Sequence, residues 1–174
     1  MEIKKIVTGT LDENCYVLIK NGNCLVVDPG ADYTNIREAV GDNKVLGVLI
    51  THSHFDHIGA LRNFLTKRSI KIFKRSNLEE KEYEIGDFKF KCLHTPGHSK
   101  DSVTFYFEED NAMFVGDFIF EGSIGRVDLP GGSQSEMEES LQRFINLDFD
   151  VNLYPGHGEA TTLNKEKETN PYFN

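Results

Sequence analysis

Apolar residues occur in short runs, separated by turns, along the first fifty residues. The strands predicted from these runs cover residues 3–7, 15–19, 24–27 and 45–50. Asn21-Gly22 is a typical hairpin turn between the second and third runs. Apolar spacing at 35–40 predicts a short helix before the fourth strand. This half of the chain therefore predicts a strand meander followed by a strand-helix-strand unit.

The second half continues with short strands and ends in a helix. The predicted strands cover residues 70–73, 83–85, 88–93, 103–107, 112–115 and 151–154. Helices are predicted at 58–65 and 163–169, and the pair Ser135 and Glu138 resembles a capping box at the start of another. The sequence therefore predicts a mixed α/β (α+β) protein. Two mixed sheets with helices on their outer faces would satisfy the pattern.

Length and composition fit one domain of 174 residues, with 39% apolar and 27% charged residues. No apolar run approaches the roughly 20 residues of a membrane span, so no membrane partner is expected. The first residues lack the apolar core of a secretory signal, which predicts a cytoplasmic protein. The oligomeric state stays open.

Charge and cysteine content narrow the function further. A net charge of −9 disfavours binding to phosphate backbones, so no nucleic-acid partner is expected, although bound metal ions can reverse the field locally. The three cysteines are widely spaced and form no zinc-ribbon or redox motif. Reduced, mostly buried thiols are therefore expected.

Four potential metal ligands lie in one loop, directly after the apolar run that ends at Ile50. They are His52, His54, Asp56 and His57. On an extended segment His52 and His54 share one side, and a turn after them aims Asp56 and His57 elsewhere. Imidazole and carboxylate ligands suit zinc, iron or manganese.

Three more candidates each follow a strand and a glycine. They are His98, Asp117 and His157. Glycine tolerates the turned backbone that presents a ligand from the end of a strand. A lone histidine is more often an ordinary core or surface residue, but the recurrence of this turn favours a metal centre.

Two further residues have less certain roles. His94 belongs to the strand before the His98 turn, so a packed or outer position is favoured over direct ligation. Asp28 ends a predicted strand, where it either forms a turn or orients a ligating imidazole.

The His-x-His-x-Asp-His run and the Thr-Pro-Gly-His, Val-Gly-Asp and Pro-Gly-His-Gly turns resemble, in this order, the metallo-β-lactamase superfamily. The resemblance covers nearly the whole chain and implies one domain, 1–174, with an αββα sandwich fold. It also implies two metal ions, the first on His52, His54 and His98 and the second on Asp56, His57 and His157. Asp117 would bridge them.

Within that superfamily, residues 122–133 and 169–173 look like those of small glyoxalase II-like hydrolases. This resemblance implies hydrolysis of a small-molecule thioester, S-lactoylglutathione, to lactate and glutathione. Full-length glyoxalase II has a C-terminal helical domain that supplies much of the glutathione contact, and this chain is expected to lack it. Thioester hydrolysis therefore transfers better than glutathione specificity.

The implied mechanism uses two divalent ions, zinc first and iron or manganese as alternatives, to lower the pKa of a shared water towards about 7. Asp56 would position this nucleophile or accept its proton. Arg126 is a candidate for gripping a substrate carboxylate, although a local pair with Asp128 is favoured. Phe118 and Phe120 are interpreted as packing residues.

Three competing functions remain. A persulfide dioxygenase would use one Fe(II) on His52, His98 and Asp117. A lactone or phosphodiester hydrolase would use the same metals, but no basic patch supports a nuclease. A non-catalytic metal-binding protein should have lost ligands, whereas all seven positions are filled here.

Overall fold

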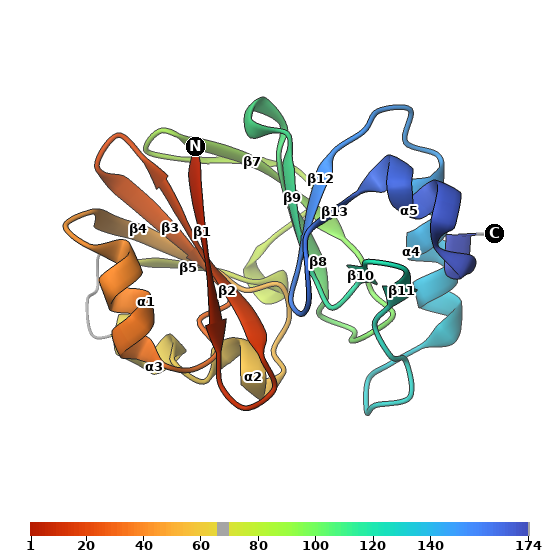
Figure 1. Cartoon of the computed structure of the whole chain (residues 1–174), viewed down its shortest axis with the longest axis horizontal. Coiled ribbons are helices and arrows are strands. Elements are labelled where there is room, and N and C mark those ends of the chain that lie inside the picture. Colours follow the sequence, from red (N-terminus) through yellow and green to blue (C-terminus); the bar gives the residue numbers. More distant parts are fainter. Residues whose placement is uncertain (66–69, 174) are drawn as a thin grey trace.

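The computed structural model describes residues 1–65 and 70–173, which form two mixed sheets (Figure 1). The first sheet has the order β1-β2-β3-β4-β5, with antiparallel pairs up to β3 and parallel pairs from β3 onward. Its strands are β1 (Glu2–Thr8), β2 (Glu13–Lys20), β3 (Asn23–Val27), β4 (Lys44–Leu49) and β5 (Lys71–Phe73). The parallel pairs bring the ends of β3 and β4 to the same edge, where the ligand loop begins.

The second sheet has the order β13-β12-β9-β8-β7-β6, and β12 with β9 is its parallel pair. Its strands are β6 (Glu82–Ile85), β7 (Phe88–His94), β8 (Val103–Phe107), β9 (Ala112–Gly116), β12 (Asn152–Pro155) and β13 (Thr161–Thr162). A small hairpin of β10 (Ile119–Phe120) and β11 (Ser123–Ile124) follows β9. The strand prediction missed β10, β11 and β13, which have only two residues each.

Helices cover the outer face of each sheet, so the layers are helix, sheet, sheet, helix. Figure 1 shows α1 (Tyr33–Val40) and α3 (Leu61–Phe64) beside the first sheet and α4 (Gln134–Ile145) and α5 (Leu163–Thr169) beside the second. Short 3₁₀ turns lie at Arg75–Asn77, Glu108–Asp110 and Pro171–Phe173. The predicted αββα sandwich is confirmed. No helix in the described part of the chain is long and apolar enough to cross a membrane.

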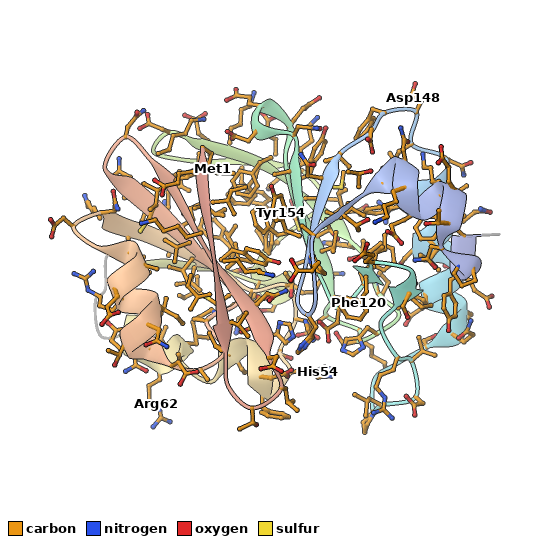
Figure 2. The ribbon with its side chains drawn as sticks, in the orientation of Figure 1. Met1, His54, Arg62, Phe120, Asp148 and Tyr154 are labelled. Carbon is orange, nitrogen blue, oxygen red and sulfur yellow. The ribbon has the colours of Figure 1, made fainter. Side chains whose placement is uncertain are left out.

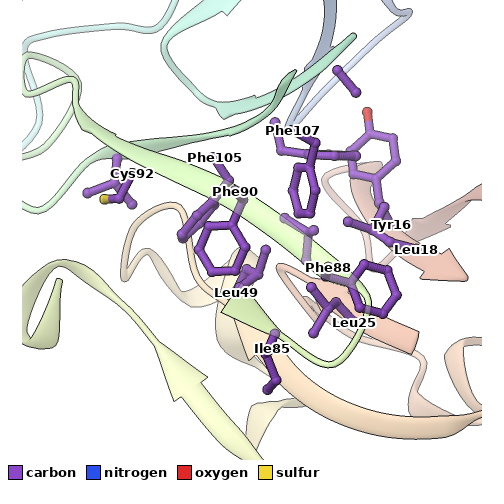
Figure 3. Packing of buried hydrophobic residues seen from close by; sticks show 14 of the residues in the cluster. Tyr16, Leu18, Leu25, Leu49, Ile85, Phe88, Phe90, Cys92, Phe105 and Phe107 are labelled. Atoms are coloured by element: carbon purple, nitrogen blue, oxygen red, sulfur yellow. The ribbon is translucent and has the colours of Figure 1, made fainter. Parts of the chain in front are cut away.

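Alternation along the strands explains this layering. Tyr16 and Leu18 on β2 point into the core between the sheets, whereas Cys15 and Val17 pack towards α1. Figure 3 shows the core between the sheets, in which Phe90, from β7, packs near Leu49, from β4. The cysteines are buried and free, as expected. Because both faces of β2, β3, β8 and β9 are buried, these strands are nearly continuous apolar runs, whereas the more exposed β1, β6 and β7 alternate with lysines and glutamates.

Two helix predictions are corrected. The helix predicted at 58–65 is two short ones, α2 (Phe55–Ile58) and α3. The break follows from the Ala60 amide, which donates to the Pro29 carbonyl at 2.9 Å and not to a carbonyl of α2. Gly59 permits this close approach, since a Cβ there would lie 2.2 Å from the Gly30 carbonyl oxygen. At α4 the N-cap is Ser133 and not Ser135, since Ser133 has extended backbone and its Oγ accepts from the Glu136 amide.

Candidate metal centre

The seven predicted ligands come together at one edge of the sandwich, between the sheets. Figure 2 shows His54 at this edge, at the bottom of the view. The loops that carry them follow β4, β7, β9 and β12. Two turn glycines are required by close packing: a Cβ on Gly116 would lie 2.3 Å from Thr51 Oγ1, and one on Gly156 would lie 2.4 Å from Asp117 Oδ1. The glycines therefore let strand ends approach the centre.

The first ligand set consists of His52, His54 and His98. His54 Nδ1 lies 3.1 Å from His52 Nε2 and 2.9 Å from His98 Nε2. All three offer a ring nitrogen within 4.8 Å of the others. His52 and His98 are buried, and His54 faces the pocket. Three imidazole nitrogens that converge in this way form a typical site for a divalent cation.

The second set consists of Asp56, His57 and His157, whose ligand atoms also lie within 4.8 Å of one another. Asp56 Oδ2 is 3.3 Å from His157 Nε2 and 3.8 Å from His57 Nε2. A third group of donors, Asp28, His52 and His57, overlaps both sets, so the two sets adjoin each other.

Asp117 lies between the two sets. Its Oδ1 is 3.3 Å from His57 Nε2, and its Oδ2 is 3.5 Å from His98 Nε2 and 3.7 Å from His157 Nε2. Among buried side-chain atoms, His57 Nε2 and Asp117 Oδ1 have no hydrogen-bond partner. Buried polar atoms without a partner are costly, and a cation on both would remove that cost. The donor set thus fits bound divalent metals.

Hydrogen bonds from Nδ1, on the side of the ring away from the centre, fix the orientation of three of the imidazoles. Three Nδ1 atoms meet oxygens outside the centre: His57 meets Asp28 Oδ2 at 2.9 Å, His98 the Arg126 carbonyl at 2.7 Å and His157 the Leu11 carbonyl at 3.0 Å. With Nδ1 donating, Nε2 is left free to bind a metal. Asp28 thus contacts the ring of His57, and its left-handed backbone, with φ of 46°, also fits a turn, so both roles left open for it stay in place.

The ionisation of the buried groups suits metal binding. Burial, with the nearby charge of His57, holds the pKa of His52 well below its ordinary value, so His52 is a neutral imidazole. Burial opposes charge on Asp117, yet its contacts with His57 and other imidazoles lower the pKa of this carboxyl overall. Burial likewise opposes charge on His57, but Asp117 and Asp28 raise its pKa. Without a metal these carboxylates therefore favour a proton on the His57 imidazole, and a cation bound at Nε2 would replace that proton.

His94 lies outside both ligand sets. Its backbone amide donates to Glu80 Oε1, and its Nε2 lies 3.3 Å from the Leu78 carbonyl oxygen. It is packed against the segment before β6, as favoured from the sequence.

Two polar residues at the start of β2 were not found from the sequence. Asn14 is buried, and its Nδ2 donates to the carbonyls of Pro155 at 3.0 Å and Gly158 at 2.9 Å, so it holds the turn that carries His157. Glu13 is fully buried, with Oε1 3.8 Å from His57 Nδ1. Burial and the charge of Asp28 raise the pKa of Glu13 to about 9. The sequence did show that Glu13 and Asn14 are two polar residues at the start of an otherwise apolar strand.

The metal centre opens into a cavity of about 800 Å³. Phe120 lines it, with its ring centroid 6.3 Å from that of His157, so it packs against the metal centre and also faces the cavity. Phe118 does pack, against Phe144. Phe118 precedes β10, so strand alternation does not relate its side chain to that of Phe120. Arg126 also lines the cavity, while its Nε and Nη2 both donate to Asp128 at 2.7 Å.

Replacing Asp28 with asparagine should weaken metal binding at the second set by about 10-fold to 100-fold, the usual effect of removing a carboxylate behind a ligating histidine. Asp28 accepts from the Thr51 amide at 2.7 Å as well as from His57, and a neutral amide cannot serve both equally. Chelator competition with metal analysis measures the affinity.

Asp32→Asn is the matched control for Asp28→Asn. Both aspartates have left-handed backbone, with φ of 48° and 46°, but Asp32 is exposed and accepts from the Gly9 amide. Equal metal affinity in both variants would contradict the role of Asp28.

A family model, several curated proteins and several solved structures resemble this chain. A model of the metallo-beta-lactamase superfamily matches residues 8–81 and 74–157. A probable metallo-hydrolase of Bacillus subtilis, YqgX, is 30% identical over 100% of this chain and 98% of its own length. The hydroxyacylglutathione hydrolase GloC of Haemophilus influenzae is 26% identical over 100% of this chain and 99% of its own.

Among solved structures, the BLEG-1 B3 metallo-beta-lactamase has a TM-score of 0.93 at 29% identity and covers 99% of both chains. A di-iron-bound form of TTHA1623 has a TM-score of 0.86 at 30% identity, covering 97% of this chain and 99% of that one. ETHE1 from Myxococcus xanthus has a TM-score of 0.88 at 25% identity, covering 98% and 84%.

Proposed function

Since this chain belongs to the metallo-beta-lactamase superfamily, we propose that it is a metal-dependent thioester hydrolase of the hydroxyacylglutathione hydrolase type. The observation that carries the proposal is the pair of ligand sets around Asp117 at the floor of an open cavity. The similarity to a hydroxyacylglutathione hydrolase over the whole chain supports it. The reference substrate is S-lactoylglutathione, with lactate and glutathione as products.

In this proposal His52, His54 and His98 would hold a first divalent ion and Asp56, His57 and His157 a second, and Asp117 would contribute to both sites. Bound divalent ions supply an activated water and polarise the substrate carbonyl. Zinc is the first metal to test, and iron and manganese follow because the same ligand types accept them. The di-iron form of a structure 30% identical supports including iron.

The side chains themselves perform the remaining steps. Asp56 lines the cavity, so its carboxylate can hold a water and accept a proton from it. Hydrogen bonds from Nδ1 of His57, His98 and His157 keep the imidazoles from rotating. The leaving group is a thiolate, and because a free thiol has a pKa near about 8.5, its departure needs little help from an acid. No protein nucleophile is required.

Thiol release from S-D-lactoylglutathione tests the proposal, with protein reconstituted separately with zinc, iron and manganese. Asp56→Ala should lower the release by about 10²-fold to 10⁴-fold, the usual contribution of a positioned base. Asp42→Ala, a change at an exposed residue outside the centre, should leave the rate unaltered. Absence of thiol release with every metal would refute the proposed function.

An oxygenase with a single iron, of the persulfide dioxygenase kind, is the second candidate. Its ligands would be His52, His98 and Asp117, and the similarity to ETHE1 favours including it. One iron per chain with oxygen consumption would identify this activity. Lactone and phosphodiester substrates belong in the same comparison, because the same centre can serve their hydrolysis.

The proposal includes a small-molecule substrate and a cytoplasmic location. Three free, buried cysteines agree with a reducing compartment.

A further inference from the structure

The cavity in front of the metal centre has an apolar wall. Leu11, Phe55, Phe120 and Leu129 line it and come from four different segments of the chain. Leu11 is 51% exposed and Phe55 is 75% exposed, so large apolar side chains stand in solvent at a cavity mouth. Such a concentration of exposed apolar surface marks a place where a ligand is bound.

The same cavity offers little to an anionic group. Apart from the histidines and aspartates of the centre, Arg126 is the one charged side chain among the described residues that line it. Asp128 already occupies Arg126 through two parallel hydrogen bonds of 2.7 Å. Glutathione carries two carboxylates, and in this cavity each of them would have to compete with Asp128 for Arg126.

We infer that this site prefers thioesters whose thiol half is apolar and uncharged, such as an aralkyl thiol, over those of glutathione. The inference rests on the proposed thioester hydrolysis and specifies its substrate class. In that reaction water adds its oxygen to the carbonyl carbon as the carbon–sulfur bond breaks, and its protons pass to the thiolate and to solvent. The apolar wall packs against the thiol half, and the acyl half faces the metal centre.

Two substrates with the same acyl group test the preference: S-D-lactoylglutathione and the D-lactoyl thioester of benzyl mercaptan. The metal-loaded protein should hydrolyse the benzyl thioester with a kcat/KM at least about tenfold higher, because the benzyl group buries apolar surface. A kcat/KM equal or higher for S-D-lactoylglutathione would overturn the inference.

Two variants, at Asp128 and Leu129, test whether the lining of the cavity causes the substrate preference. Asp128→Asn releases Arg126 and should raise kcat/KM for S-D-lactoylglutathione up to about fivefold, as expected from an exposed ion pair, without changing that for the benzyl thioester. Leu129→Gln should lower the ratio of benzyl to glutathione activity. An unchanged ratio in both variants would overturn the assignment.

Binding measured by calorimetry separates this inference from the proposed function. In the 2-oxopropyl thioethers of benzyl mercaptan and glutathione, a methylene between sulfur and carbonyl prevents hydrolysis. The benzyl thioether should bind at least about tenfold more tightly. If neither thioester is hydrolysed, the proposed function fails, but tighter binding of the benzyl thioether still supports the inference and tighter binding of the glutathione thioether overturns it.

Discussion

Replacing Asp117 with asparagine is expected to lower kcat/KM for thioester hydrolysis by at least about 10³-fold, or about 4 kcal/mol of transition-state stabilisation. Asparagine has nearly the same size, so packing is kept, but the negative charge between the two ligand sets is lost. Asp117 approaches His57, His98 and His157 within 3.3 to 3.7 Å, so both sets are affected. Steady-state kinetics and metal content per chain measure the effect.

Asp148→Asn is the control for this variant. Asp148 is exposed, and Figure 2 shows it at the end of the molecule opposite His54. The control should keep wild-type activity and metal content. If Asp117→Asn also bound the full metal complement with undiminished activity, the placement of Asp117 between two metals would be refuted.

The ligand positions could be predicted because their chemistry and spacing are both visible in the sequence. His52, His98, Asp117 and His157 each follow an apolar run, and strands of a sandwich bring such ends to a common edge. The longer strands and helices show their own periods and gave the mixed α/β character, whereas the αββα layers were implied by the resemblance to the metallo-β-lactamase superfamily. Local sequence patterns were therefore sufficient to find the candidate ligands that lie at strand ends.

Features that depend on contacts between distant segments were not predictable. The break after α2 follows from the hydrogen bond of the Ala60 amide to the Pro29 carbonyl, 31 positions earlier in the sequence. Asn14 meets Pro155 and Gly158 only after the two sheets pack together. Phe120 lies on a strand of two residues, too short to show alternation. In each case the partner, and not the local pattern, decides the role.

Asn14→Ala is expected to weaken the second ligand set selectively. Asn14 Nδ2 donates to the carbonyls of Pro155 and Gly158, and the Asn14 backbone amide donates to the Gly156 carbonyl at 2.7 Å, so β2 holds the turn that carries His157. The backbone hydrogen bond survives the substitution, but the buried side-chain bond to Pro155 and the partly buried one to Gly158 do not. We expect a loss of about 1–3 kcal/mol in the free energy of unfolding and about 10-fold to 100-fold in hydrolytic activity.

Metal content after Asn14→Ala distinguishes a two-metal centre from a one-metal centre. His52, His54 and His98 do not depend on the His157 turn, so the variant should retain about one tightly bound ion per chain while the second is lost to a chelator. Asn164→Ala, at an exposed position on α5, is the matched control and should keep both. A hydrolase that needs both ions loses activity together with the second ion. If Asn14→Ala loses that ion but retains full turnover, the reaction needs only the first set, and the single-iron alternative becomes the better description.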